Sequence, residues 1–282
     1  MHLALSHVPL FYYIISQYFL KVFHLIFEYT VSTMDSDIGY ILRNWPYDPE
    51  EDLIVRIIEG DDGPKLQMRI DMGIIQMELD GNPTGESPEG CVSWFEYYKT
   101  NQKRYESNKV DDFFTLNDED CNKLRREAVH YYYRYLCLMK LGDYKRVIRD
   151  TDRNYRVFAF VRKYAASEMN RWALDQYRPY VIMMNIRARA SLAIKENPRY
   201  GLEKAIEYIN SGMGKILKFY KEYGITSEVE NSVELSILKA MKKEFLRNLP
   251  LSLEEQLQEA LREERFEDAA YLRDKIRSKQ KD

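Results

Sequence analysis

The sequence predicts a mainly α-helical protein, in which a small antiparallel β module precedes paired helical hairpins and a separate helical hairpin forms the C-terminus. Glycine and proline, with 12 and 9 residues out of 282, make up about 7% of the chain where ~12% is typical, which predicts long elements and few loops. Apolar residues recur at helical spacing in the second half, whereas alternation of apolar and polar residues is limited to residues 65–80. An apolar content of 45% and a charged content of 31% exclude wholesale disorder and a multi-pass membrane protein.

The first segment, residues 1–33, is strongly apolar but is interrupted by polar residues such as Lys21 and Glu28. Lys21 at the centre of a membrane-spanning helix would cost roughly 2.5–3.5 kcal/mol on insertion scales. The segment lacks the basic start and the small-residue cleavage site of a secretory signal. Since an ordinary soluble composition begins at Met34, we expect translation to start there, with no stable membrane insertion; a membrane-associated helix is the main alternative.

Residues 34–98 form the expected acidic β-rich module. A β-branched run at residues 52–58 precedes a glycine- and aspartate-rich turn, and two alternating runs follow it. This pattern predicts a three-stranded meander with one apolar face that needs cover. The polar face could be a recognition surface, and the alternative is a solvated outer face with cross-strand ion pairs. The candidate residues of this polar surface are Arg69, Asp71, Gln76 and Glu78.

Charge is distributed unevenly along the chain. Residues 35–98 hold 15 acidic and 4 basic residues, a net charge of −11, whereas residues 99–249 hold 30 basic and 20 acidic residues, a net charge of +10. The two blocks could face each other or keep their own surfaces solvated, or the basic block could bind a polyanion such as nucleic acid. Acids and bases alternate along most of the predicted helices, which favours the first interpretation.

Residues 99–249 are expected to form a helical body. The predicted helices run from Asn117 or Asp118 to about Lys140, from Tyr144 to Tyr164, from Asp175 to Lys195 with an interruption at Pro179, and from Leu202 to Tyr223. The two helix pairs resemble a longer-helix version of a tetratricopeptide (TPR) array, and the runs LGDYKRVI and EKAIEYI resemble the inner part of that repeat. Val147, however, stands where the repeat usually has a small residue.

The sequence offers no catalytic, cofactor or metal site. Cys91, Cys121 and Cys137 lie 30 and 16 residues apart and the chain has only four histidines, so a zinc site is not expected. No nucleotide-binding or catalytic-triad motif occurs. We therefore expect no cofactor and no enzymatic activity, and the odd number of cysteines suits a reducing cytoplasm.

Residues 250–282 are expected to form the C-terminal hairpin. Ser252 and Glu255 form a capping box, and two apolar stripes follow it. Small Ala269 and Ala270 within the second stripe predict a close approach of the two helices, and Phe266 is the candidate for the ring of the hairpin core. The candidate partner-binding residues are Leu257, Leu261, Phe266, Ala269, Ala270, Leu272, Arg273, Asp274 and Ile276.

The runs Phe266-Glu267-Asp268-Ala269-Ala270 and Leu272-Arg273-Asp274-Lys275-Ile276 closely resemble the UVR motif of the UvrB and UvrC excision-repair subunits, Clp ATPases and the arginine-kinase activator. The likeness covers residues 251–280. It implies a hairpin that pairs with another UVR hairpin or docks on a partner protein, without chemistry of its own. Residues 44–280 also resemble bacterial UVR motif-containing proteins of unassigned function.

These observations together predict a cytoplasmic, bacterial, non-enzymatic adaptor. Its partner would be a protein that carries a UVR hairpin or a surface on which such a hairpin docks. One alternative is a nucleic-acid-binding protein of DNA repair or the stress response, which would use the basic body. A second alternative is an enzyme that uses the polar face of the β module, with Arg69, Asp71 and Glu78.

Overall fold

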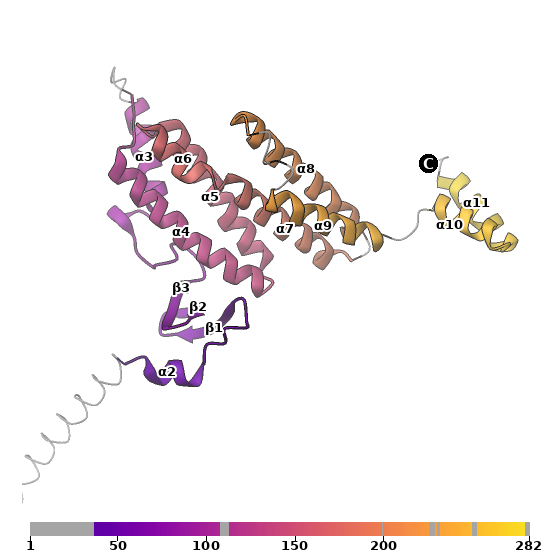
Figure 1. Ribbon diagram of the computed structural model, residues 1–282, viewed down its shortest axis with the longest axis horizontal. Coiled ribbons are helices and arrows are strands. Elements are labelled where there is room, and N and C mark those ends of the chain that lie inside the picture. Colours follow the sequence, from indigo (N-terminus) through magenta and orange to yellow (C-terminus); the bar gives the residue numbers. More distant parts are fainter. Residues whose placement is uncertain are drawn as a thin grey trace, which may run out of the picture.

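The computed structural model describes residues 37–107, 113–198, 200–225, 229, 232–249 and 253–279. The expectations for residues 1–33 and for Met34 lie outside these described residues. The elements are α2 (Gly39–Asn44), β1 (Ile54–Gly60), β2 (Gly63–Ile70), β3 (Gly73–Glu78), the short 3₁₀ turn Pro88–Gly90, α3 (Trp94–Ser107), α4 (Asp118–Lys140), α5 (Tyr144–Tyr164), α6 (Glu168–Asp175), α7 (Arg178–Glu196), α8 (Gly201–Glu222), α9 (Val233–Arg247), α10 (Leu253–Arg262) and α11 (Phe266–Lys279). The predicted mainly α-helical fold with one small antiparallel sheet is confirmed (Figure 1).

The sheet is the predicted meander, with strand order β1-β2-β3 and antiparallel pairing throughout. Two-residue turns join the strands, so Asp71 lies in the β2–β3 turn rather than within a strand. On the apolar face, Leu66, Met68 and Met77 are buried in the same cluster as residues of α4. The helical body therefore covers the apolar face, as the alternation predicted.

The polar face of the sheet is covered along β2, which corrects in part the expectation of a solvated outer face, whereas Gln76 of β3 is exposed. Lys65, Gln67 and Arg69 of β2 are all buried. The chain that leaves α2 covers the Arg69 end of this face: Arg69 Nε donates to the Trp45 carbonyl at 2.9 Å, and the Arg56 guanidinium lies 3.9 Å from the centre of the Trp45 ring. This cover comes from a segment that is distant in sequence from β2, so alternation alone does not predict it.

Helices α4 and α5 begin and end where their end signals predict. Asn117 and Asp120 form a reciprocal capping box at the start of α4. Gly142, with φ of 71°, ends α4 in a Schellman motif, in which Asp143 N–H donates to the Leu138 carbonyl at 3.0 Å. The Asp143 side chain then caps α5, so a single tight turn ends one helix and starts the next.

The predicted third helix is wrong at its start. Asp175 ends a separate helix, α6, and α7 begins at Arg178. Pro179 therefore lies in the first turn of α7, where its missing N–H removes no helical hydrogen bond, and it does not interrupt the helix. Helix α8 packs along α7, and α9 packs against α8.

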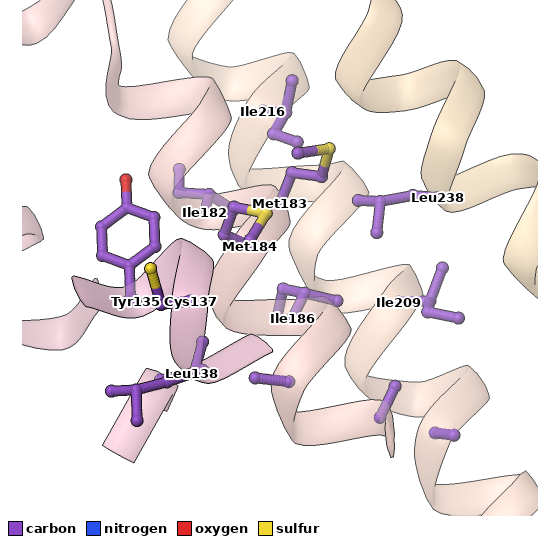
Figure 2. Packing of buried hydrophobic residues seen from close by; sticks show 14 of the residues in the cluster. Tyr135, Cys137, Leu138, Ile182, Met183, Met184, Ile186, Ile209, Ile216 and Leu238 are labelled. Carbon is purple, nitrogen blue, oxygen red and sulfur yellow. The ribbon is translucent and has the colours of Figure 1, made fainter. Parts of the chain in front are cut away.

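Two hydrophobic clusters fill the described part of the body. The larger one joins the sheet, the C-terminal half of α4 and helices α7 to α9, and Met183 and Met184 lie buried at its centre (Figure 2). The second cluster joins α3, the N-terminal half of α4, α5 and α6. Helices α7 and α8 approach closely at Gly212, where a Cβ atom would lie 2.5 Å from Ile186 Cγ1.

A buried arginine joins the β module to the helical body. Arg134 of α4 is fully buried and forms two hydrogen bonds with Asp150 of α5, at 2.7 and 2.9 Å. Its Nη1 donates to the carbonyls of Glu78 and Gly81 at 3.0 Å each. The side chain therefore holds the chain that follows β3 through its backbone, while Asp150 balances the charge.

Exposed ion pairs extend this joint at the surface. Arg146 Nη2 lies 2.8 Å from Asp80 Oδ2, and Arg149 also pairs with Asp80. These arginines hold the pKa of Asp80 well below its ordinary value, with the Arg146 hydrogen bond as the largest cause. Acidic residues of the β module and basic residues of the body therefore face each other here, which supports the first interpretation of the uneven charge.

Candidate functional site: the C-terminal hairpin

Helices α10 and α11 pack against each other as an antiparallel hairpin (Figure 1). The turn between them is a Schellman motif in which Arg265 N–H donates to the Ala260 carbonyl at 2.8 Å and Glu264 N–H donates to the Leu261 carbonyl at 3.2 Å. Glu264 takes the left-handed conformation, with φ of 59°, at a position where glycine is usual. The predicted hairpin forms, and its turn carries some backbone strain.

Small side chains make the contact between the two helices. Ala260 and Ala269 are 0% and 4% exposed, and the structure shows no other buried hydrophobic residue in α10 or α11 among the described side chains. Three larger residues, Leu257, Leu272 and Ile276, are half-buried around this contact. The alanines allow the helix axes to come close, as the sequence predicted.

The expectation that Phe266 fills the hairpin core is wrong. Its side chain is 66% exposed, and Leu261 is 47% exposed. Phe266 begins α11 and lies about 60° around the helix from Ala269 and about 120° from Leu272, at 3.6 residues per turn. The ring therefore points to the side of the helix contact and not into it.

The nine predicted partner-binding residues fall into two groups. Ala269 is buried and Leu257, Leu272 and Ile276 are half-buried, whereas Leu261, Phe266, Ala270, Arg273 and Asp274 are exposed. Arg273 Nη2 lies 2.9 Å from Asp274 Oδ1, and both side chains are exposed. An exposed pair of neighbouring residues adds little stability, so both charges can meet a partner.

The exposed residues Leu261, Phe266 and Ala270 lie on one face of the hairpin. On α11, Phe266, Ala270, Arg273 and Arg277 recur at spacings of three and four residues. On α10, Leu257 and Leu261 have the same spacing. Leu261 and Ala270 each follow a buried alanine, and each lies about 100° around its own helix from that alanine. Because the two helices are antiparallel, one of these rotations is clockwise and the other counterclockwise when both are viewed from the same end of the hairpin. Both stripes therefore turn to the same side.

We call this side the apolar–basic face, and it comprises Leu257, Leu261, Phe266, Ala270, Arg273 and Arg277. The opposite side holds Glu259, Glu263, Asp268, Tyr271 and Lys275 and is called the polar face. Arg277 was not among the predicted partner-binding residues, although its spacing of four from Arg273 was a sufficient signal. Tyr271, which is 67% exposed, is as exposed as Phe266 but lies on the polar face.

The structure does not gather the polar residues of the β module into a reaction site. Arg69 Nη1 donates to the backbone carbonyls of Ile70, Asp71 and Gly73, so it organises the β2–β3 turn. Glu78 pairs with Lys65 at 2.6 Å, at the opposite end of β2. The Asp71 side chain is exposed in the turn, and Gln76 accepts a hydrogen bond from Gln67 at 2.8 Å.

Neither a metal-binding cluster nor a membrane-spanning helix occurs within the described ranges. No group of three or more His, Cys, Asp or Glu residues there could hold a metal ion. Burial raises the pKa of the Cys121 thiol to about 11 and that of Cys137 to about 12, whereas Cys91 is half-buried. In the same part of the chain, every helix is too short or too polar to cross a membrane.

A two-helix hairpin with alanines at its contact and an exposed apolar stripe defines an interaction module. The protein-family model described as the UvrB/uvrC motif matches residues 251–282, which include this hairpin. The chain thus carries a UVR motif, which in repair proteins serves interaction with protein or DNA. No curated protein and no solved structure matches the chain. The TPR-like character of the body stays a prediction.

Proposed function

We propose that the protein is a cytoplasmic, non-enzymatic bacterial adaptor that docks on a protein partner through the apolar–basic face of its UVR hairpin. The partner would present a second UVR hairpin or an equivalent helical surface. The observation that carries this proposal is the position of Phe266, which is 66% exposed on the apolar–basic face of a hairpin whose own contact is made by two alanines.

The hairpin buries little apolar surface by itself. Helices α10 and α11 have 10 and 14 residues, and elements of this size need further burial for a robust fold. Covering a large apolar side chain contributes about 1.5–3 kcal/mol. Burial of Phe266 and Leu261 by a partner would therefore add stability that the isolated hairpin lacks.

Charge at the edge of the same face favours particular partners. Arg273 and Arg277 flank the apolar residues on α11, so a partner with acidic residues beside an apolar stripe fits best. The hairpin's own polar face has this acidic character, with Glu259, Glu263 and Asp268. The other uses of Arg69 and Glu78 in the β module support a role without catalysis.

Phe266 and Tyr271 provide a matched test of the proposal. Both are aromatic residues of α11 with nearly equal exposure, 66% and 67%, but they lie on opposite faces. The full-length protein, Phe266→Ala and Tyr271→Ala are used to capture partners from the native cells, and the captured proteins are identified. We expect UVR-containing partners to be retained by the wild type and by Tyr271→Ala and lost with Phe266→Ala.

The opposite results contradict the proposal. Equal capture of the same partners by both variants would exclude the apolar–basic face as the docking surface. Circular dichroism of the two variants should match that of the wild type, since neither ring is buried.

Nucleic-acid binding is the second candidate function, because the exposed residues Arg273 and Arg277 are four positions apart and therefore neighbours on the apolar–basic face. Fluorescence anisotropy with labelled duplex DNA, at about 50 and 200 mM salt, tests it. Under the adaptor proposal we expect weak binding that Arg273→Glu hardly changes. Sub-micromolar binding that falls steeply with salt and is lost with Arg273→Glu would favour the nucleic-acid function instead.

A further inference from the structure

A pocket of about 500 Å³ opens between α4, α5, α6 and α7, away from the hairpin motif. It lies where the two hydrophobic clusters of the body meet, since Ala128, Phe158, Leu174 and Val181 belong to one cluster and Tyr135 belongs to the other. We call it the tyrosine pocket, because Tyr132, Tyr135, Tyr177 and Tyr180 contribute to its wall. Its volume is in the range of small-molecule sites.

Tyr135 brings a hydroxyl group to this pocket that is free to bind a ligand. Tyr135 is 1% exposed, lines the pocket, and forms no hydrogen bond within the described residues. Figure 2 shows its hydroxyl pointing away from Cys137 and Leu138. Burial raises the pKa of Tyr135 well above its ordinary value, so the group keeps its proton and can donate. A ligand with an acceptor atom in the pocket would give this hydroxyl a hydrogen bond.

The rings around this hydroxyl suit a planar aromatic ligand. Tyr132 and Tyr135 stand nearly perpendicular, at 88° with centroids 5.5 Å apart, and Tyr180 lies 6.0 Å from Tyr132. Aromatic rings prefer such edge-to-face and tilted contacts, and a further ring in the pocket would continue them. Burial also raises the pKa of Tyr180 to about 12, so this wall is neutral at physiological pH.

The mouth of the pocket carries exposed apolar groups and one positive charge. Val129 is 41% exposed and Tyr177 is 55% exposed, so both side chains can contact a ligand that enters the pocket. Arg125 also lines the pocket, and its Nη2 donates to the neutral Asn122 side chain at 2.9 Å. The guanidinium therefore keeps its full charge for an anion at the mouth.

We propose that the tyrosine pocket binds a small planar aromatic anion. The ring packs among the tyrosines, an acceptor atom takes the Tyr135 hydroxyl hydrogen, and the anionic group lies beside Arg125. This site is separate from the hairpin, so it stands whether or not the adaptor proposal holds.

The test uses anilinonaphthalene sulfonate, an anion with a planar naphthalene ring, and the full-length protein. Fluorescence titration should show one saturable site. Tyr135→Phe removes only the hydroxyl and should weaken binding about five- to tenfold, the equivalent of one hydrogen bond. Arg125→Gln should weaken binding and reduce its dependence on salt. Ala173→Trp, which adds bulk to a residue of the pocket wall, should abolish the site.

Phe266→Ala is the matched control, because the dye also binds exposed apolar surfaces. Its affinity should equal that of the wild type. Loss of the dye with Phe266→Ala, or unchanged affinity with Tyr135→Phe, would overturn the proposal. If the hydroxyl were only a packing defect, Tyr135→Phe would raise the unfolding midpoint in urea and leave dye binding unchanged. Displacement of the dye by neutral N-acetyl-phenylalanine amide but not by salicylate would instead assign the pocket to a partner's aromatic side chain.

Discussion

Two glycines of α8 offer a direct test of how tightly the body is packed. Gly212 is buried against α7, and a Cβ atom there would lie 2.5 Å from Ile186 Cγ1 and 3.2 Å from Ile186 Cβ. Gly214, two positions further along the same helix, would place its Cβ atom in open space, with nothing within 4 Å. Replacement of each glycine by alanine therefore makes the same chemical change in two different surroundings.

The expected magnitudes follow from these distances. Carbon atoms pack best at about 3.5–4.0 Å, so Gly212→Ala forces about 1 Å of overlap with Ile186, or a shift of α7 relative to α8. Overpacking of this kind costs about 1–3 kcal/mol. Each substitution also gains about 1 kcal/mol in helix propensity. Gly214→Ala should thus be stabilised by about 1 kcal/mol, and Gly212→Ala should be less stable than it by about 1–3 kcal/mol.

Urea unfolding of the full-length variants, followed by circular dichroism, measures this difference. A double variant, Gly212→Ala with Ile186→Ala, should show favourable coupling, since the added methyl group then occupies space that Ile186 vacates. Equal stability of Gly212→Ala and Gly214→Ala would refute the close packing of α7 and α8 at this point.

Three further predictions concern other parts of the molecule. Arg134→Met leaves Asp150 buried with one fewer cation and should lower the free energy of unfolding by about 3–5 kcal/mol, measured in urea; a loss under 1 kcal/mol would contradict the buried joint. Native protein should react with a thiol reagent at Cys91 and not at the buried Cys137, whose pKa of about 12 keeps it protonated, and rapid labelling of all three thiols would be inconsistent with this. Glu264→Gly removes left-handed strain of about 1 kcal/mol, so amide hydrogen exchange in α10 and α11 should slow about fivefold, and faster exchange would exclude a strained turn.

Local signals predicted the elements that local chemistry determines. Asn117 and Gly142 located both ends of α4, because a cap side chain and a left-handed glycine act within one turn of helix. The role of Pro179 was predicted wrongly. Proline can either break the interior of a helix or begin a helix, and the sequence alone did not show which of these applies at position 179.

Contacts between distant segments account for the rest. The cover on Arg69 comes from Trp45, 24 positions earlier, which no alternation within the strand indicates. Helical spacing placed Phe266 in an apolar stripe, but in a hairpin of two helices such a stripe is either the internal contact or an exposed face. Ala260 and Ala269 bring the two helices so close together that a large ring does not fit between them, and the stripe that contains Phe266 is therefore an exposed face.

The joint at Arg134 has a consequence for how relatives of this chain can differ. Arg134 binds the carbonyls of Glu78 and Gly81, and Arg149 Nη2 donates to the Leu79 carbonyl at 2.8 Å. Every residue type supplies a carbonyl, so these hydrogen bonds place little selection on the side chains of the loop, whereas the Asp80 side chain is held by Arg146 and Arg149. Homologous sequences should therefore keep both arginines together with Asp80, and an alignment would show more variation at the other positions of the contacted loop than at the two arginines.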